Sequence, residues 1–130
     1  MGMYTELIFG VVLKKDTPDQ VIKALKYMIG ETEKPNDFPL PDGRCEWLFQ
    51  GGSYYFAIND SVTKMWIDKI DKQWHISTRS NIKNYEGEIE TFLEWIKPYI
   101  DGGSGRRNFY AITIYEEASV PTIYYLEDED

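Results

Sequence analysis

The chain has 130 residues, a formal net charge of −8, and 42% hydrophobic and 28% charged residues. A chain of this length forms one ordinary domain and buries about two-thirds of its unfolded surface, so it needs neither a metal nor a disulfide to fold. The composition is that of a globular protein and excludes wholesale disorder.

Half of the negative net charge comes from the last four residues, Glu127, Asp128, Glu129 and Asp130. We expect them to form a frayed acidic tail. The rest of the chain is still acidic, which argues against a nucleic-acid partner because phosphate backbones are repelled. The single cysteine, Cys45, excludes an internal disulfide and favours a reducing compartment. Since the sequence has no apolar run of membrane-spanning length and no signal-peptide pattern, we expect a cytoplasmic protein without membrane association.

The first two predicted elements are a strand and a helix. Tyr4 to Lys14 alternates apolar residues and is partly apolar on both faces, which predicts a strand in the middle of a sheet. Thr17 to Ile29 carries an apolar stripe at helical spacing. Thr17 and Gln20 fit a capping box at its start, and Gly30 is suited to end it.

The middle of the chain predicts a loop followed by a hairpin. Glu31 to Gly43 contains three prolines and little periodicity, so we expect a long loop there. Arg44 to Gln50 and Ser53 to Ile58 are predicted strands, because the intervening Gly51-Gly52 is a strong hairpin signal.

The second half predicts further strands around one helix. The strands are expected at Val62 to Ile67, Gln73 to Arg79, Asn108 to Glu116 and Pro121 to Leu126. The helix is expected at Tyr85 to Lys97, with Asn84 as its cap and Pro98 at its end.

The resulting order, β-α-β-β-β-β-α-β-β, predicts the α+β class. We expect residues 1–126 to form a single domain, with a mostly antiparallel sheet of about six strands and two helices packed on one face. Residues 127–130 would follow it as the acidic, disordered tail.

Few residues have the pattern of a catalytic or metal site. His75 is the only histidine, and Ser77, its neighbour on the same strand face, is about 7 Å away, too far for a direct hydrogen bond. Cys45 lacks the local signature of a nucleophile and is interpreted as a small buried hydrophobe. One histidine and one cysteine do not make a common zinc set. We therefore expect no catalytic residue, metal or cofactor, and favour a protein that is not an enzyme.

Three carboxylates on the second predicted helix form the first binding candidate. Glu86, Glu90 and Glu94 are spaced at i, i+4 and i+8, which places them in one stripe. Like charges at this spacing cost a few tenths of a kcal/mol each. The stripe is interpreted either as a docking surface for a basic protein or as an ordinary solvated helix face.

Aromatic and basic residues supply the other binding candidates. The chain has 4 Trp, 10 Tyr and 6 Phe, and such residues are enriched at interfaces and in ligand pockets. The candidates are Tyr54, Trp74, Trp95 and Tyr99. Arg106 and Arg107 follow a glycine-rich segment that either binds an anion or only relaxes the chain direction.

The leading hypothesis is a non-catalytic interaction protein of the inhibitor or immunity type, which uses the acidic helix face and exposed aromatic residues to bind a basic partner. One alternative is a small-molecule-binding domain with an aromatic pocket, over which Glu31 to Gly43 would form a lid. Another is a structural subunit that forms a homodimer through the sheet face left bare by the helices.

Overall fold

The computed structural model of the chain describes residues 4–53, 57, 59–102 and 109–126. The elements in these residues are β1 (Thr5–Val12), α1 (Asp19–Ile29), η1 (Arg44–Trp47), β2 (Lys64–Ile67), β3 (Trp74–Ile82), α2 (Glu88–Ile96), η2 (Lys97–Tyr99), β4 (Phe109–Tyr115) and β5 (Thr122–Tyr125), where η denotes a 3-10 helix. Within the same residues, no helix combines the length and apolar character needed to cross a membrane. The predicted acidic tail, residues 127–130, lies outside them.

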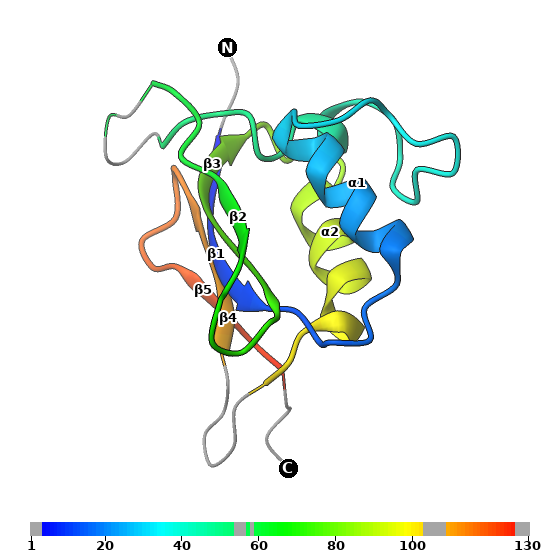
Figure 1. Cartoon of the computed structure of the whole chain (residues 1–130). Coiled ribbons are helices and arrows are strands. Elements are labelled where there is room, and N and C mark those ends of the chain that lie inside the picture. The colour runs from blue at the N-terminus through cyan, green and yellow to red at the C-terminus, as the bar shows by residue number, and fades with distance from the viewer. Residues whose placement is uncertain (1–3, 54–56, 58, 103–108, 127–130) are drawn as a thin grey trace.

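The strands form one antiparallel sheet in the order β2-β3-β1-β4-β5. Both α-helices lie on the same side of this sheet (Figure 1). The α+β class, the antiparallel sheet and the one-sided arrangement of helices are therefore confirmed, with five strands instead of about six. β1 is the central strand, as its two partly apolar faces predicted.

The predicted strand at Arg44 to Gln50 is wrong, because this segment contains η1. Cys45, Leu48 and Phe49 are all buried, and their spacing of i, i+3 and i+4 places them on one side of a helical turn. Burial at helical spacing outweighed the hairpin signal of the two glycines that follow. The partner strand predicted at Ser53 to Ile58 lies largely outside the described residues.

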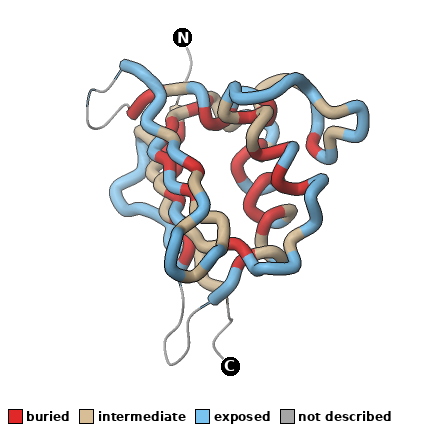
Figure 2. Tube along the Cα trace, viewed as in Figure 1, coloured by how far each residue is buried: buried red, intermediate tan, exposed pale blue. Residues whose placement is uncertain are grey.

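The core fills the space between the sheet and the helices, where buried segments of both layers face each other (Figure 2). Phe92 of α2 is at its centre. Its ring packs edge-to-face on Phe9 of β1, with centroids 5.3 Å apart, and on Phe49, with centroids 5.1 Å apart. Each such buried side chain contributes about 1.5–3 kcal/mol of hydrophobic stabilisation, so this cluster holds the helix layer to the sheet.

The start of α1 differs from the predicted capping box. The hydroxyl of Thr17 donates to the carbonyl oxygen of Lys14 at 2.6 Å, so it closes the preceding turn and does not cap the helix. Pro18 is the N-cap, without a side-chain hydrogen bond, and the helix begins at Asp19. The predicted end is confirmed, because Gly30 has a left-handed φ of 97°, which glycine adopts without a steric penalty.

The second helix is shorter than predicted, since α2 begins at Glu88 and not at Tyr85. The N-cap is Gly87 and not the predicted Asn84. The side-chain oxygen of Asn84 still accepts a hydrogen bond from the Ile89 amide, in the first turn of α2, at 2.8 Å. Glu86 therefore lies in the turn before the helix. Of the three carboxylates predicted to form a helical stripe, only Glu90 and Glu94 are on the helix.

Candidate functional site

The side of the sheet opposite the helices, which we call the open face, is the main candidate surface. Side chains alternate between the two faces of a strand, and the register identifies those on this face. They are Glu6, Ile8, Gly10 and Val12 of β1, Lys64 and Trp66 of β2, His75, Ser77, Arg79 and Asn81 of β3, Phe109, Ile112 and Ile114 of β4, and Ile123 and Tyr125 of β5.

Apolar groups make up much of this face. Ile8, Ile112 and Ile114 are half-buried and stay in reach of solvent. Phe109 is 62% exposed and Ile123 45% exposed. Phe109 stands out because a register shift between Phe109 and Ala111 interrupts the pairing of β4 with β5, and such bulges redirect side chains. An exposed apolar surface of this kind is typical of a binding face.

A hollow of about 260 Å³ lies in the open face, lined by Gly10, Val12, Trp66, His75 and Ser77 together with the backbone around them. Gly10 is paired directly with Ser77 across β1 and β3, so two small residues form the floor. The rings of Trp66 and His75 stack at one wall, with centroids 5.3 Å apart and planes inclined by 21°.

Gly10 is not required by the backbone geometry of β1. Its φ is outside the positive region, and an added Cβ would meet only the carbonyl oxygen of Ile76, at 4.0 Å. Glycine inside a strand costs about 0.5–1 kcal/mol relative to alanine. Glycine inside a strand is typical of a bulge, a tight bend or a place where a ligand or another backbone approaches closely.

The exposed charged side chains that the strands carry on the open face are basic, although the half-buried carboxylate of Asp71 contacts His75. Glu6 is the only carboxylate in the five strands; it is fully buried and accepts a hydrogen bond from the Ser53 hydroxyl at 2.7 Å. Lys64 and Arg79 are exposed, and the Lys64 ammonium lies 5.0 Å from the centre of the Trp66 ring. The face therefore offers apolar groups and positive charge within a chain whose net charge is −8.

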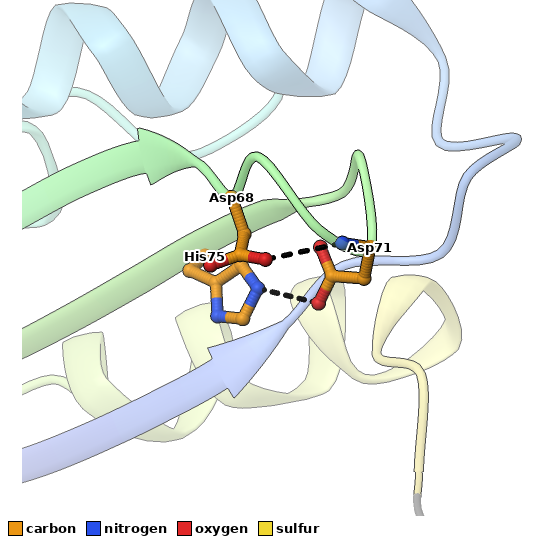
Figure 3. Close-up of side chains that lie close together, drawn as sticks. All are labelled: Asp68, Asp71 and His75. Carbon is orange, nitrogen blue, oxygen red and sulfur yellow. Dashed lines mark hydrogen bonds and ion pairs between the residues drawn. The ribbon is translucent and has the colours of Figure 1, made fainter.

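Asp68, Asp71 and His75 gather at the hairpin between β2 and β3, with one potential ligand atom of each within 4.8 Å of the others (Figure 3). One oxygen of Asp68 accepts the amides of Ile70 and Asp71 at 2.9 and 3.1 Å. One oxygen of Asp71 accepts a hydrogen bond from the Gln73 amide, and the other is hydrogen-bonded to the Nε2 atom of His75, each at 2.9 Å. These hydrogen bonds lower the pKa of Asp71, and the bond from the Gln73 amide has the largest effect.

The hydrogen bonds of the hairpin explain this cluster without a metal, since its carboxylates already satisfy backbone amides. Asp71 does supply the orienting acid that a catalytic His75 would need. Among the described residues, however, no hydrogen bond joins His75 to Ser77 or to another hydroxyl. His75 is therefore interpreted as a structural part of the hollow, whose wall it forms by stacking on Trp66.

The residues predicted as an acidic docking face are distributed around α2. Glu90 and Glu94 are exposed, and neither forms an ion pair with a basic residue in the described part of the chain. The Glu90 carboxylate accepts a hydrogen bond from the Asn84 amide at 2.8 Å. Trp95 and Tyr99 are half-buried against the core, with ring centroids 6.3 Å apart, so they flank the helix more than they project from it.

The other predicted residues lie elsewhere. Trp74 begins β3 on the helix side of the sheet, under the ammonium of Lys26, which lies 4.7 Å from its ring centre. Tyr54, Arg106 and Arg107 lie outside the described residues. The structure thus does not bring the predicted binding residues together at one site.

Sequence reasoning missed the open-face hollow, although one signal for it was present. Gly10 interrupts a strongly apolar strand, and an isolated glycine in a strand indicates a bulge or a close approach. Trp66 and Ser77 gave no such signal, since only the register of β2, β3 and β1 brings them beside Gly10. Comparison of the chain with protein-family models, with curated proteins and with solved structures gives no match, so its function is argued from this geometry.

Proposed function

We propose that this chain is a non-catalytic binding protein of the cytoplasm that recognises another protein through the open face. The observation that carries the proposal is the hollow over Gly10, at the centre of an apolar sheet face that neither α-helix covers (Figure 1). An apolar side chain of the partner would enter the hollow against Val12 and the stacked rings of Trp66 and His75. Such an anchor in a pocket is where binding energy concentrates in protein interfaces.

The thiol of Cys45 supports binding over catalysis. Cys45 is buried, its sulfur lies 3.6 Å from the carbonyl oxygen of Glu88, and burial raises the pKa of the thiol to about 11. A thiol with such a pKa is protonated at neutral pH, whereas a nucleophilic cysteine needs the thiolate.

The partner we propose presents an apolar surface bordered by acidic groups. On the open face, Lys64 and Arg79 lie close to the strand positions that line the hollow. The single carboxylate within the strands, that of Glu6, is buried. The exposed pair Glu90 and Glu94 would instead suit a basic partner on α2. The two surfaces therefore predict partners of opposite charge, and a test can separate them.

The test begins with a photo-crosslinking side chain at Ile112 on the open face and, in a second variant, at Glu94 on α2. The proposal expects one protein to be crosslinked from position 112 and not from position 94. That protein is then purified and titrated by calorimetry against Ile123→Asp and, as a matched control, Val120→Asp. Both side chains are exposed aliphatics, but only Ile123 is on the open face.

Loss of at least about tenfold in affinity with Ile123→Asp, and little change with Val120→Asp, supports the proposal, because a buried carboxylate without a partner costs more than 1.4 kcal/mol. Crosslinks confined to position 94 would move the contact to the acidic surface of α2. Equal affinities of the two variants for the purified partner contradict an open-face contact.

A second copy of this chain is the alternative occupant, favoured by one observation. The exposed ring of Phe109 projects from the same face that carries the hollow, and an isologous dimer needs such self-complementarity. Sedimentation of the purified protein over a range of concentrations tests it. A dimer that Phe109→Asp abolishes, and that Ile70→Asp at the hairpin leaves intact, supports self-association; a monomer at all concentrations rules it out.

A further inference from the structure

A second hollow, of about 220 Å³, lies on the helix side of the sheet, between the β1–α1 connection and the β2–β3 hairpin. Its lining residues are Lys14, Lys15, Thr17, Asp19, Ile22, Ile67, Lys72, Gln73 and Trp74. Three of them are lysines, and they come from two segments far apart in the sequence. A fourth lysine, Lys26, stands over the ring of Trp74 at 4.7 Å.

The lysines at this hollow form no ion pair with the described carboxylates, although the charge of Lys15 acts on Asp71 and helps to lower its pKa. The one carboxylate in the lining, Asp19, is paired with Lys23 at 3.4 Å. Among the described residues, no carboxylate lies within ion-pair distance of Lys14, Lys15, Lys26 or Lys72. Of the neighbouring acids, Asp71 is held by the Gln73 amide and His75. In a chain with a net charge of −8, ammonium groups brought together in this way create a local field that attracts an anion.

The two lysine-bearing segments are braced in place. The amide and the hydroxyl of Thr17 both donate to the Lys14 carbonyl oxygen, at 3.1 and 2.6 Å. The side chain of Gln73 donates to the carbonyl oxygen of Leu13 at 3.0 Å and to Asp101 at 2.7 Å, which ties the hairpin to the end of β1. Bracing of this kind reduces the entropy that a ligand must remove on binding.

Lys72 is an unusual residue for its position. It has a φ of 62°, in the left-handed region where glycine, asparagine and aspartate are the usual residues. Glycine would satisfy this turn without strain. A lysine here accepts the backbone cost and adds an ammonium group to the lining of the hollow.

From this convergence we infer that the hollow is an anion site for a phosphate group, held by Lys14, Lys15 and Lys72. The volume is below the roughly 300–1,000 Å³ of sites for drug-sized ligands, so it suits a phosphate or diphosphate and not a whole nucleotide. The apolar wall of Ile22, Ile67 and Trp74 would face the remainder of a phosphate ester. α1 begins on the rim, where the first amides of a helix add positive potential.

The test is a titration of the full chain, at constant ionic strength, with inorganic diphosphate and, separately, with phenyl phosphate. The readout is the indole N–H resonance of Trp74, assigned with Trp74→Phe. The inference expects saturable shifts of this resonance with at least one probe. Tighter binding of diphosphate would identify a diphosphate group as the ligand, and tighter binding of phenyl phosphate a monoester of an apolar compound.

The variant Lys14→Gln/Lys72→Gln should weaken binding at least about tenfold, as expected when charge-assisted hydrogen bonds are lost. Lys64→Gln is the matched control, since Lys64 also lies over a tryptophan ring, that of Trp66, on the opposite face. The inference is overturned if neither probe shifts the Trp74 resonance at probe concentrations up to about 10 mM, which is ten times a 1 mM dissociation constant. It is also overturned if Lys64→Gln weakens binding as much as the double variant. Both outcomes are independent of the protein partner proposed for the open face.

Discussion

Gly10 of β1 and Ser77 of β3 lie directly opposite each other in the middle of the sheet, so the centre of the open face is built from two of its smallest side chains. The larger side chains of Val12, Trp66 and His75 stand around them. A sheet face filled for stability alone would carry β-branched or aromatic pairs at such central positions. The hollow therefore costs stability, and replacing Gly10 with a larger residue measures that cost.

Gly10→Val should raise the free energy of unfolding by about 1 kcal/mol. Valine removes the conformational freedom of glycine in the unfolded chain and suits a central strand, and the space above Gly10 is free for a Cβ. Urea unfolding measures the change. The same variant should lose affinity for an open-face partner, because the hollow is filled. A variant that is less stable than the wild type would show that Gly10 is needed for packing.

Glu6 and Ser53 should be energetically coupled, since their hydrogen bond of 2.7 Å is buried. It joins the central strand to the segment that follows η1. A double-mutant cycle with Glu6→Gln and Ser53→Ala should give a coupling free energy of about 0.5–3 kcal/mol. Chemical denaturation of the four proteins measures it. Strictly additive effects would mean that the contact adds nothing to stability.

The stability should depend on Glu46 at acid pH. Its carboxylate accepts hydrogen bonds from the Tyr27 hydroxyl at 2.7 Å and the Gly43 amide at 2.9 Å, and pairs with Lys34 at 3.2 Å. These contacts, with the hydrogen bond from the tyrosine first, lower the pKa of Glu46 below the ordinary glutamate value of about 4.5. The folded state thus binds this proton less readily than the unfolded state, so the contribution is complete above pH 4.5 and is lost as the pH falls below it.

Glu46→Gln measures this contribution. At pH 7 the variant should be less stable than the wild type by roughly 1.5–3 kcal/mol, the range for hydrogen bonds to a charged group. The difference should shrink as the pH falls from 5 to 3, which denaturant midpoints at several pH values will show. A difference that does not change with pH would assign the effect to packing alone.

Cys45 should resist alkylation in the folded protein. Burial raises the pKa of its thiol to about 11, so about 0.1% is thiolate at pH 8. Mass spectrometry after iodoacetamide treatment should find the native protein unmodified under conditions that alkylate the urea-unfolded protein fully. Equal rates in both states would show that the thiol is accessible without unfolding.

The sequence alone predicted the elements whose signals are local. The alternation in Tyr4 to Lys14 identified β1 and its central place, because a strand apolar on both faces has to be covered by neighbours. Gly30 marked the end of α1 by its conformational freedom. Asn84 indicated that a helix begins nearby, although the N-cap of α2 is Gly87. The fold class followed from the order of these elements.

The errors arose where a local signal competed with long-range packing. Gly51-Gly52 indicated a hairpin, but the helical burial of Cys45, Leu48 and Phe49 was worth more than the turn. Glu86 fitted a helical stripe, but the helix starts after Gly87. In both places the hydrophobic contacts of residues distant in sequence decided the outcome, and a short window does not contain them.

The candidate sites depended almost entirely on tertiary structure. The sequence determined that the chain is acidic, rich in aromatic residues and folded with its helices on one face. Only the register of β1 with β3 brought Gly10 beside Ser77, and only the hairpin brought Lys72 to Lys14 and Lys15. The reason is physical: spacing along a chain records which side chains share a face of one element, whereas a site consists of side chains whose elements pack together.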